Sequence, residues 1–252
     1  GIRVLALTDH DNVEGLAAAR LAAQTQMITL INGVEISTTW RNHTIHVVGL
    51  NIDPNNHELC TGLNAVRSGR QARAQAMADD LAQRAGIFDI LPLAYEYAGH
   101  PDQISRTHFA RALVTLGKVK EAKAAFNKYL VPGKPGYIKH EWTSIAQAIA
   151  WIHAAGGVAV LAHPARYALN PTALASLMSH FIEWGGQAVE VVTSNHSVDD
   201  VKHFAQLTQH YGLQASCGSD FHSPSERYAD MGRLTPLPTG CVPVWQHWNL
   251  VL

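Results

Sequence analysis

Residues 157–164 read GVAVLAHP, an almost unbroken apolar run that ends in a histidine and a proline. Similar short runs recur along the chain: RVLALTD (3–9), MITLINGVEIS (27–37), HTIHVVGLNI (43–52), QAVEVVTS (187–194) and LQASCGSDFH (213–222). Runs of Val, Leu, Ile and Ala without alternation are typical of strands in a parallel sheet that is covered on both faces. We therefore expect a buried, mainly parallel sheet.

Amphipathic segments between these runs predict the helices that cover the sheet. Apolar residues recur at helical spacing in segments 13–25, 144–155, 172–184 and 198–211. Asp11 or Asn12 is a candidate cap for the first helix, Ser144 is one for the second, and Pro171 opens the third. Because strands and helices alternate, the predicted fold class is α/β.

The stretch 66–135 departs from this alternation. No strand separates its periodic helical segments, which are RSGRQARAQAMADDLAQRAG (67–86), HFARALVTLG (108–117) and VKEAKAAFNKYL (119–130). We interpret it as a helical subdomain inserted into the α/β domain. The expected boundaries are therefore 1–65 and 136–252 for the two parts of the α/β domain and 66–135 for the insertion. At 252 residues the chain is long enough for such a core, since single cores stop growing near about 250–300 residues.

Composition excludes several classes of protein. Lys and Arg total 19 against 20 for Asp and Glu, so the chain has no global positive field to hold long nucleic acids. The cysteines Cys60, Cys217 and Cys241 lack CxxC spacing, which argues against a disulfide framework and a thiolate zinc site. No apolar run reaches the roughly 18 residues of a membrane span, and no cleavable signal is visible. We expect a cytoplasmic protein with no membrane or protein partner.

Nearly every apolar run leads into an imidazole or a carboxylate. These candidate metal ligands are His10, Glu35, His46, His163, Asp220 and His222. In a parallel α/β barrel the carboxyl ends of the strands meet at one mouth, so side chains that follow different strands converge there. His46 lies near the start of its run, and would reach the mouth if its strand runs antiparallel or if it lies on a connecting loop.

Nitrogen and oxygen donors without cysteine favour Zn, Mn or Fe in a hydrolytic site. A carboxylate such as Glu35 can bridge two metals that clamp the attacking and leaving oxygens of a phosphoryl displacement. Phosphate ester hydrolysis is therefore the predicted chemistry. Dinucleotide binding is not predicted, because no GxGxxG motif follows the first strand.

The order of the motifs TDHD (8–11), GVEIS (33–37), HTIHVVGL (43–50), LAHP (161–164) and GSDFH (218–222) resembles the PHP (polymerase and histidinol phosphatase) metallophosphoesterases. The segments ISRTHFAR (104–111), YLVPGKPGYI (129–138) and VLAHPARY (160–167) are similar to one branch of that family, the 3',5'-nucleoside bisphosphate phosphatases and 5'-to-3' exoribonucleases of the RNase AM type. The resemblance covers nearly the whole chain. It implies a distorted (β/α)7 barrel with a helical insertion and up to three divalent metals, commonly Mn, with Zn, Fe or Mg as alternatives.

Carried over motif by motif, the resemblance implies that all six candidate ligands bind metal, with Glu35 and Asp220 in the shared inner shell. It also implies that Asp9 and Asp11 orient ligands or cap the helix. The family opens with a strand that carries an HxH motif and a following Asp, and residues 1–8 contain neither. We therefore expect this chain to begin at the second barrel strand, with three family ligands outside it.

Substrate contacts are expected from basic and aromatic side chains, because phosphate recognition requires arginine forks or a lysine charge. The candidates are Arg106, Lys134 and Arg166, with His108 and Tyr137 as further contacts. Asp220 is the candidate group that takes a proton from the attacking water. His222 or His196 is the candidate acid for the departing ribose oxygen.

The predicted function is metal-dependent hydrolysis of the 3'-phosphate of nucleoside 3',5'-bisphosphates, extending to short RNA degraded from the 5' end. The expected partner is a nucleotide or a short RNA. Two alternatives stay open. One is a phosphatase of the same family for another substrate, such as histidinol phosphate, and the other is a non-catalytic module that binds metal or nucleotide.

Overall fold

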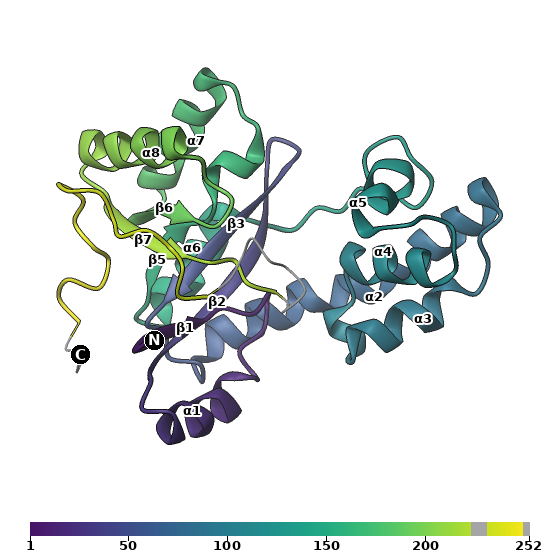
Figure 1. Ribbon diagram of the computed structural model, residues 1–252, viewed down its shortest axis with the longest axis horizontal. Helices are drawn as coiled ribbons and strands as arrows, with labels where there is room; N and C mark the ends of the chain where they lie inside the picture. Colours follow the sequence, from purple (N-terminus) through teal and green to yellow (C-terminus); the bar gives the residue numbers. More distant parts are fainter. Residues whose placement is uncertain (223–230, 249–252) are drawn as a thin grey trace. The chain divides into compact units, whose positions relative to one another are not determined.

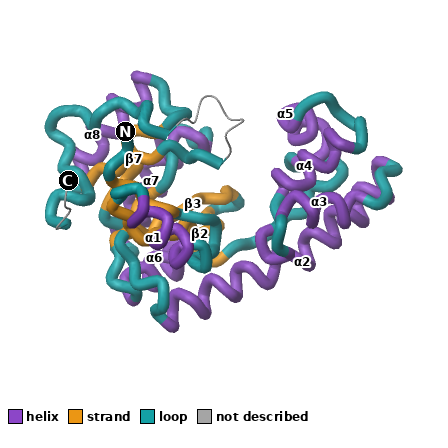
Figure 2. Tube along the Cα trace, turned by 60° about the horizontal axis from the view of Figure 1, so that its bottom comes forward, coloured by secondary structure: helices purple, strands orange, loops and turns teal. Residues whose placement is uncertain are grey.

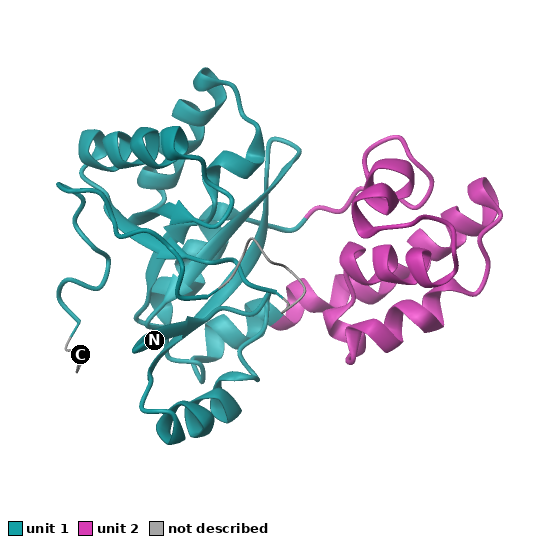
Figure 3. Ribbon diagram, in the orientation of Figure 1, with its two compact units in different colours: residues 1–63, 142–252 teal, residues 64–141 magenta. Residues whose placement is uncertain are grey.

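The computed structural model describes residues 1–222 and 231–248, and the chain divides into two compact units. Unit 1 comprises residues 1–63 and 142–252, and unit 2 comprises residues 64–141 (Figure 3). The expected helical insertion, 66–135, lies within unit 2. Among the described residues, no helix has the combination of length and apolar composition that a membrane span requires.

Unit 1 is built on one curled sheet (Figure 1). In hydrogen-bonded order its strands are β1 (Val4–Leu7), β2 (Thr29–Trp40), β3 (His43–Leu50), β5 (Val158–Leu161), β6 (Ala188–Thr193) and β7 (Gln214–Gly218), and β4 (Thr143–Ser144) pairs with β2. Each of the six apolar runs of the sequence forms one of these strands. The predicted α/β class is confirmed.

The sheet is mainly parallel, and β3, which carries His46, takes the antiparallel direction that the sequence left open for it. The pairs β1 with β2, β5 with β6 and β6 with β7 are parallel, whereas β3 runs antiparallel to both β2 and β5. Arg41 and Asn42 form a two-residue connection between β2 and β3, with φ angles of 44° and 69°. A tight turn with two positive φ angles joins antiparallel strands of a hairpin. The direction of β3 therefore follows from its turn.

The predicted helices are present as α1 (Leu16–Thr25), α6 (Ile145–Ala154), α7 (Pro171–Glu183) and α8 (Val198–Tyr211). Ser144 caps α6 as predicted, because its hydroxyl accepts the backbone N–H three residues later at 3.1 Å. The predicted cap of α1 is wrong. That helix begins after Gly15, three or more residues beyond Asp11 and Asn12.

The two faces of the sheet have different surroundings (Figure 2). The first face packs under α6, α7 and α8 and includes Val34, Ile36, Val47, Leu161 and Val189. The second face includes Val48, Val160 and Ala188, packed with Val244 from the segment after β7. Because neighbouring residues of a strand point to opposite faces, Glu35, between Val34 and Ile36, lies on the second face.

Unit 2 is helical. It contains most of α2 (His57–Ala85), followed by α3 (Ile90–Ala98), a 3-10 turn (Pro101–Gln103), α4 (Arg106–Thr115), α5 (Ala122–Ala125) and a π-helical turn (Phe126–Leu130). Its core is separate from that of unit 1 and includes Leu81, Ile90, Phe109, Leu113 and Leu130. Helix α3 was not predicted from the sequence, and α2 begins earlier than predicted.

Candidate metal centre

Glu35 is a buried carboxylate at the centre of a cluster of imidazoles. Its Oε1 lies 2.8 Å from His46 Nδ1 and 3.0 Å from His163 Nε2, and its Oε2 lies 3.7 Å from His10 Nε2. The residue is only 6% exposed. The sequence predicted Glu35 at a strand end, but β2 continues to Trp40, so the carboxylate projects from the middle of the strand.

Three different elements bring the imidazoles to this carboxylate. His46 lies on β3 two residues from Val48, so strand alternation directs it to the same face as Glu35. His10 follows β1 and pairs with Glu35 in an isolated parallel bridge. His163 follows β5 and has a φ of 29°, a backbone conformation that is strained for any residue other than glycine.

Charge and hydrogen bonding keep the central carboxylate ionised. Burial alone would raise the pKa of Glu35, but the charges of His10 and His46, together with hydrogen bonds from His163 and His46, hold this pKa well below its usual value. Burial lowers the pKa of His163, but the hydrogen bond to Glu35 and the charges of Glu35 and Glu190 together outweigh burial, so the net shift of this pKa is upward. Glu35 is therefore an anion at neutral pH.

The chemistry of these donors fits a divalent cation. The ligand atoms of His10, Glu35 and His46 all lie within 4.8 Å of one another. His46 Nδ1 and His163 Nε2 face each other at 3.2 Å, a distance at which two nitrogen lone pairs repel unless a proton or a cation lies between them. Neutral imidazoles and a carboxylate are good ligands for Mn, Fe and Zn.

A second polar group lies beside this cluster. Arg166 Nη1 forms an ion pair with Asp220 Oδ2. His222 Nδ1 lies 2.9 Å from the backbone oxygen of Asp220. The ring of His222 lies 5.7 Å from that of His10, which connects the two groups. Asp220 itself has a φ of 53°. The predicted residues Arg166, Asp220 and His222 therefore lie together, next to the imidazole cluster.

Glu190 was not among the predicted site residues. It lies on β6 two residues from Ala188, on the second face of the sheet, and its Oε2 accepts the backbone N–H of His163 at 2.7 Å. Burial raises the pKa of Glu190 to about 7, and the neighbouring His163 limits the rise. An acidic residue inside the apolar run QAVEVVTS was the signal that could have identified it.

Tyr167 also supports the cluster and was not predicted. Its hydroxyl donates to the backbone oxygen of Ala162 at 2.7 Å and accepts the backbone N–H of His46 at 2.9 Å. It thus ties β3 to the segment that carries His163. Asp11 has a similar role, because its carboxylate accepts the backbone N–H of Ser37 at 2.7 Å and so fixes the loop that carries His10 to β2.

His196 lies close to the segment after His163. Its Nδ1 is 2.9 Å from the backbone oxygen of Val191, its Nε2 is 3.5 Å from the backbone nitrogen of Ala165, and its ring stacks on Phe204. Both ring nitrogens of His196 therefore face the backbone.

The other predicted substrate contacts belong to unit 2. They are Arg106, His108, Lys134 and Tyr137. His108 accepts the backbone N–H of Ser105 at 3.1 Å and so completes the capping box of α4. Lys134 is exposed. The pKa of Arg106 is lowered by burial, and the nearby Tyr137 opposes this shift only in part.

The chain is similar to characterised bacterial proteins over nearly its whole length. It is 47% identical to the 3',5'-nucleoside bisphosphate phosphatase of Chromobacterium violaceum, a match that covers 97% of this chain and 85% of that protein. It is 43% identical to the 5'-3' exoribonuclease Rnm of Escherichia coli, covering 98% of this chain and 84% of that protein. No family model matches the chain.

Solved structures show the same likeness. A Chromobacterium violaceum protein described as an amidohydrolase with bound sulfate and no metal has a TM-score of 0.92 and 47% sequence identity, covering 97% of this chain and 84% of that one. A protein of Bifidobacterium adolescentis, assigned as a metal-dependent phosphoesterase, has a TM-score of 0.80 and 24% identity, covering 98% of this chain and 84% of that one. The second likeness shows that the fold is shared.

Proposed function

Because this chain belongs to the family of 3',5'-nucleoside bisphosphate phosphatases and 5'-3' exoribonucleases, we propose that it hydrolyses the 3'-phosphate of nucleoside 3',5'-bisphosphates and degrades short RNA from the 5' end. The protein is thus a hydrolase that acts on phosphate esters. The observation that carries the proposal is the buried carboxylate of Glu35 with three imidazole nitrogens within 3.7 Å.

His10, Glu35, His46 and His163 would hold divalent metal, with Asp220 and His222 as further ligands. Divalent cations in such a site lower the pKa of a water molecule and neutralise charge on a phosphate ester. Nitrogen and oxygen donors without a thiolate suit Mn, Fe and Zn alike. Manganese is our preferred ion because the resemblance to the PHP metallophosphoesterases implies it.

The chain's own residues supply orientation, charge and proton transfer. Glu190, Tyr167 and Asp11 fix the backbone of the segments that carry the imidazoles. Arg166, held by Asp220, supplies a guanidinium for the phosphate oxygens. Asp220 takes the proton of the attacking water in this proposal.

The departing ribose oxygen needs a proton donor, and the two candidates differ in their surroundings. The side chain of His222 is 46% exposed and lies beside Asp220. Both ring nitrogens of His196 face backbone atoms. We therefore propose that His222 donates this proton. Separately, we propose that the sheet of unit 1 is a distorted (β/α)7 barrel.

The test is phosphate release from adenosine 3',5'-bisphosphate by the full chain with Mn. We expect adenosine 5'-monophosphate as the product. The Glu35→Gln variant should lose more than about 100-fold in rate, since even outer-shell partners of a metal contribute 10–100-fold. The matched control is Glu183→Gln, which alters an exposed glutamate at the end of α7.

Parallel assays with adenosine 5'-monophosphate, histidinol phosphate and a 5'-phosphorylated RNA pentamer separate the substrate classes. The proposal requires release from the bisphosphate and shortening of the RNA. Preferred hydrolysis of histidinol phosphate, or equal activity of Glu35→Gln and Glu183→Gln, would contradict it.

A further inference from the structure

Positive charge is concentrated in unit 2, although the chain as a whole is nearly neutral. Unit 2 has twelve Lys and Arg residues against seven Asp and Glu residues, whereas unit 1 has seven against thirteen. Within unit 2 the charge is concentrated further, because residues 103–140 contain eight Lys and Arg residues and one acidic residue, Glu121. This stretch, which we call the basic segment, includes α4, α5 and the π-helical turn.

Most charged side chains of the basic segment are exposed to solvent. The exposed cations include Arg111, Lys118, Lys120, Lys123 and Lys128. Among the described residues, no acidic side chain forms an ion pair with any of these five. Their charges are therefore not offset by neighbouring carboxylates, and clustered charges of one sign produce a positive potential at the surface.

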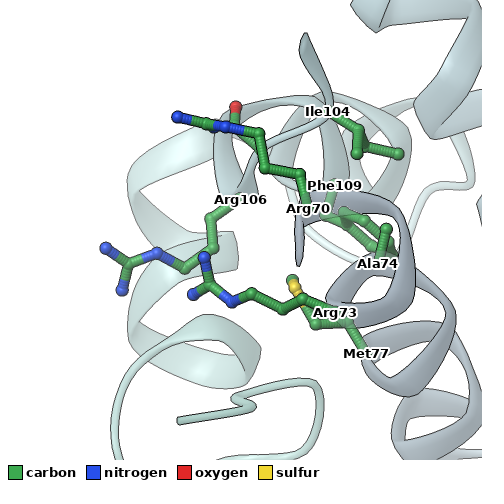
Figure 4. A pocket seen from close by; sticks show the side chains of 8 residues that line it. Arg70, Arg73, Ala74, Met77, Ile104, Arg106 and Phe109 are labelled. Carbon is green, nitrogen blue, oxygen red and sulfur yellow. The ribbon is translucent and has the colours of Figure 1, made fainter. Parts of the chain in front are cut away.

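The fold brings these charges onto elements that pack against one another. Helix α4 packs against α5 and against the π-helical turn. Arg106 is the first residue of α4, and its guanidinium carbon lies 6.0 Å from the centre of the Phe126 ring, which places the start of α4 beside that turn. Figure 4 shows the side chain of Arg106 extending away from Ile104 and Phe109, which belong to the core of unit 2.

We propose that the basic segment binds the phosphate backbone of single-stranded RNA, with Arg111, Lys118, Lys120, Lys123 and Lys128 as phosphate contacts. The choice of RNA rests on the proposed function, whereas the anionic character of the ligand rests on the charge distribution alone. Lys and Arg contacts to phosphates position a nucleic acid without reading its sequence. The surface therefore favours longer RNA over a free nucleotide, because each further phosphate adds a contact.

Aromatic rings lie among these charges, which favours RNA over an acidic peptide. Phe126 and Tyr137 are only partly buried. Lys128 Nζ lies 5.0 Å from the centre of the Tyr129 ring. Proteins that bind single strands combine positive charge for the backbone with aromatic rings on which bases stack. An acidic peptide uses the charge alone and gains nothing from a ring on which a base stacks.

The test measures binding of a fluorescent 5'-phosphorylated RNA decamer to the full chain by fluorescence anisotropy, without added metal and at several salt concentrations. The variant is Lys120→Gln/Lys123→Gln. The matched control is Arg3→Gln/Lys202→Gln, which removes the same two charges from exposed positions of unit 1. Each phosphate contact to a single strand contributes about −0.7 to the slope of log affinity against log salt. We therefore expect the variant's slope to be shallower by about 1.4, and its affinity at low salt to be about tenfold below that of the wild type and the control.

Further comparisons separate this surface from the metal centre and from general attraction to anions. Lys120→Arg/Lys123→Arg keeps both charges and should bind the decamer as the wild type does. The wild type should bind the decamer more tightly than a 5'-phosphorylated dinucleotide or a peptide of ten aspartates. Because no metal is added, failure of the proposed hydrolysis leaves this readout unaffected.

Three results would contradict the proposal. Equal affinity and equal salt slope of Lys120→Gln/Lys123→Gln and Arg3→Gln/Lys202→Gln would overturn the surface. Equal affinity of the wild type for the decamer and the dinucleotide would do the same. Equal affinity of the wild type for the decamer and the aspartate peptide would overturn the choice of RNA.

Discussion

Glu190 shows how a residue outside the predicted ligand set can fix the position of a proposed ligand. Its carboxylate accepts the backbone N–H of His163, a residue held at a φ of 29°. A non-glycine residue with positive φ persists only where its surroundings hold it there. The buried carboxylate of Glu190 is one such restraint, so disturbing it should affect the metal centre before it affects the fold.

Gly218 on β7 offers a way to test this restraint, because a Cβ at that position would overlap Glu190 Oε1. In Gly218→Ala the end of the Glu190 side chain must move, and we expect this movement to break its hydrogen bond to His163. We expect metal affinity to fall by about 10–100-fold, as for other outer-shell changes, while the urea-unfolding midpoint changes little. Ser179→Ala, on an exposed part of α7, is the control. Unchanged metal affinity in Gly218→Ala would show that Glu190 does not position His163.

His108 predicts a pH dependence of stability in unit 2. Burial lowers the pKa of His108 to about 4, with smaller contributions from the charges of Arg111 and Arg70. The ordinary histidine pKa is about 6.5, so between about pH 6.5 and pH 4 the unfolded chain binds a proton at His108 and the folded chain does not. The stabilising effect of the neutral ring is therefore complete above pH 6.5 and is lost as the pH falls toward 4.

The variant His108→Gln tests this prediction without removing the capping box, because Gln is a normal partner at that position. Between pH 7 and pH 5 the wild type should lose more unfolding free energy than the variant, as measured by urea unfolding. Loss of the same amount by both proteins would mean that His108 does not titrate in this range.

Among the elements, strands were easier to predict than their directions. Six apolar runs identified β1, β2, β3, β5, β6 and β7, because buried strands need continuous apolar residues. The antiparallel direction of β3 depends on the two-residue turn at Arg41 and Asn42, whose positive φ angles are not evident from residue type. Helix α3 was missed because Pro92 and aromatic residues weaken its helical pattern, although Pro is tolerated in a first turn.

The candidate site was predictable to the extent that residue type and strand position decide it. His10, Glu35, His46 and His163 lie together because their strands share a sheet. Glu190 was not recognised, since its partner is a backbone N–H contributed by a distant segment. Contacts of that kind depend on tertiary packing, which leaves no local pattern in the sequence.

Helix α7 gives a prediction at the same scale. Asn170 caps it by accepting the backbone N–H of Ala173 at 2.9 Å, and Pro171 occupies its first turn. Asn170→Ala should lower the free energy of unfolding by about 1 kcal/mol, whereas Asn170→Asp should retain most of it, because Asp is an equally good cap. Urea unfolding of the two variants is the measurement. Similar losses in both would indicate that this cap does not stabilise the helix.

At the scale of the whole molecule, the candidate metal centre and the helical core around Leu81 and Phe109 belong to different compact units. The proposed ligands around Glu35 come from unit 1, and their backbones lie on or after β1, β2, β3 and β5. Unit 2 has its own hydrophobic core. A ligand that binds one unit should therefore slow hydrogen exchange at the backbone amides of that unit more than at those of the other unit.

Metal binding should stabilise unit 1 selectively. A ligand that binds only the folded state adds RT ln(1 + [L]/Kd), about 2.7 kcal/mol at 100 times Kd. Because β2 and β3 carry Glu35 and His46, we expect added Mn to slow hydrogen exchange most strongly at the amides of these strands, and much less at α3 and α4 of unit 2. Exchange read by mass spectrometry with and without Mn is the measurement, and Glu35→Gln, which removes the central ligand, is the control. Equal slowing in both units, or slowing that persists in Glu35→Gln, would place the stabilising ion elsewhere than at this cluster.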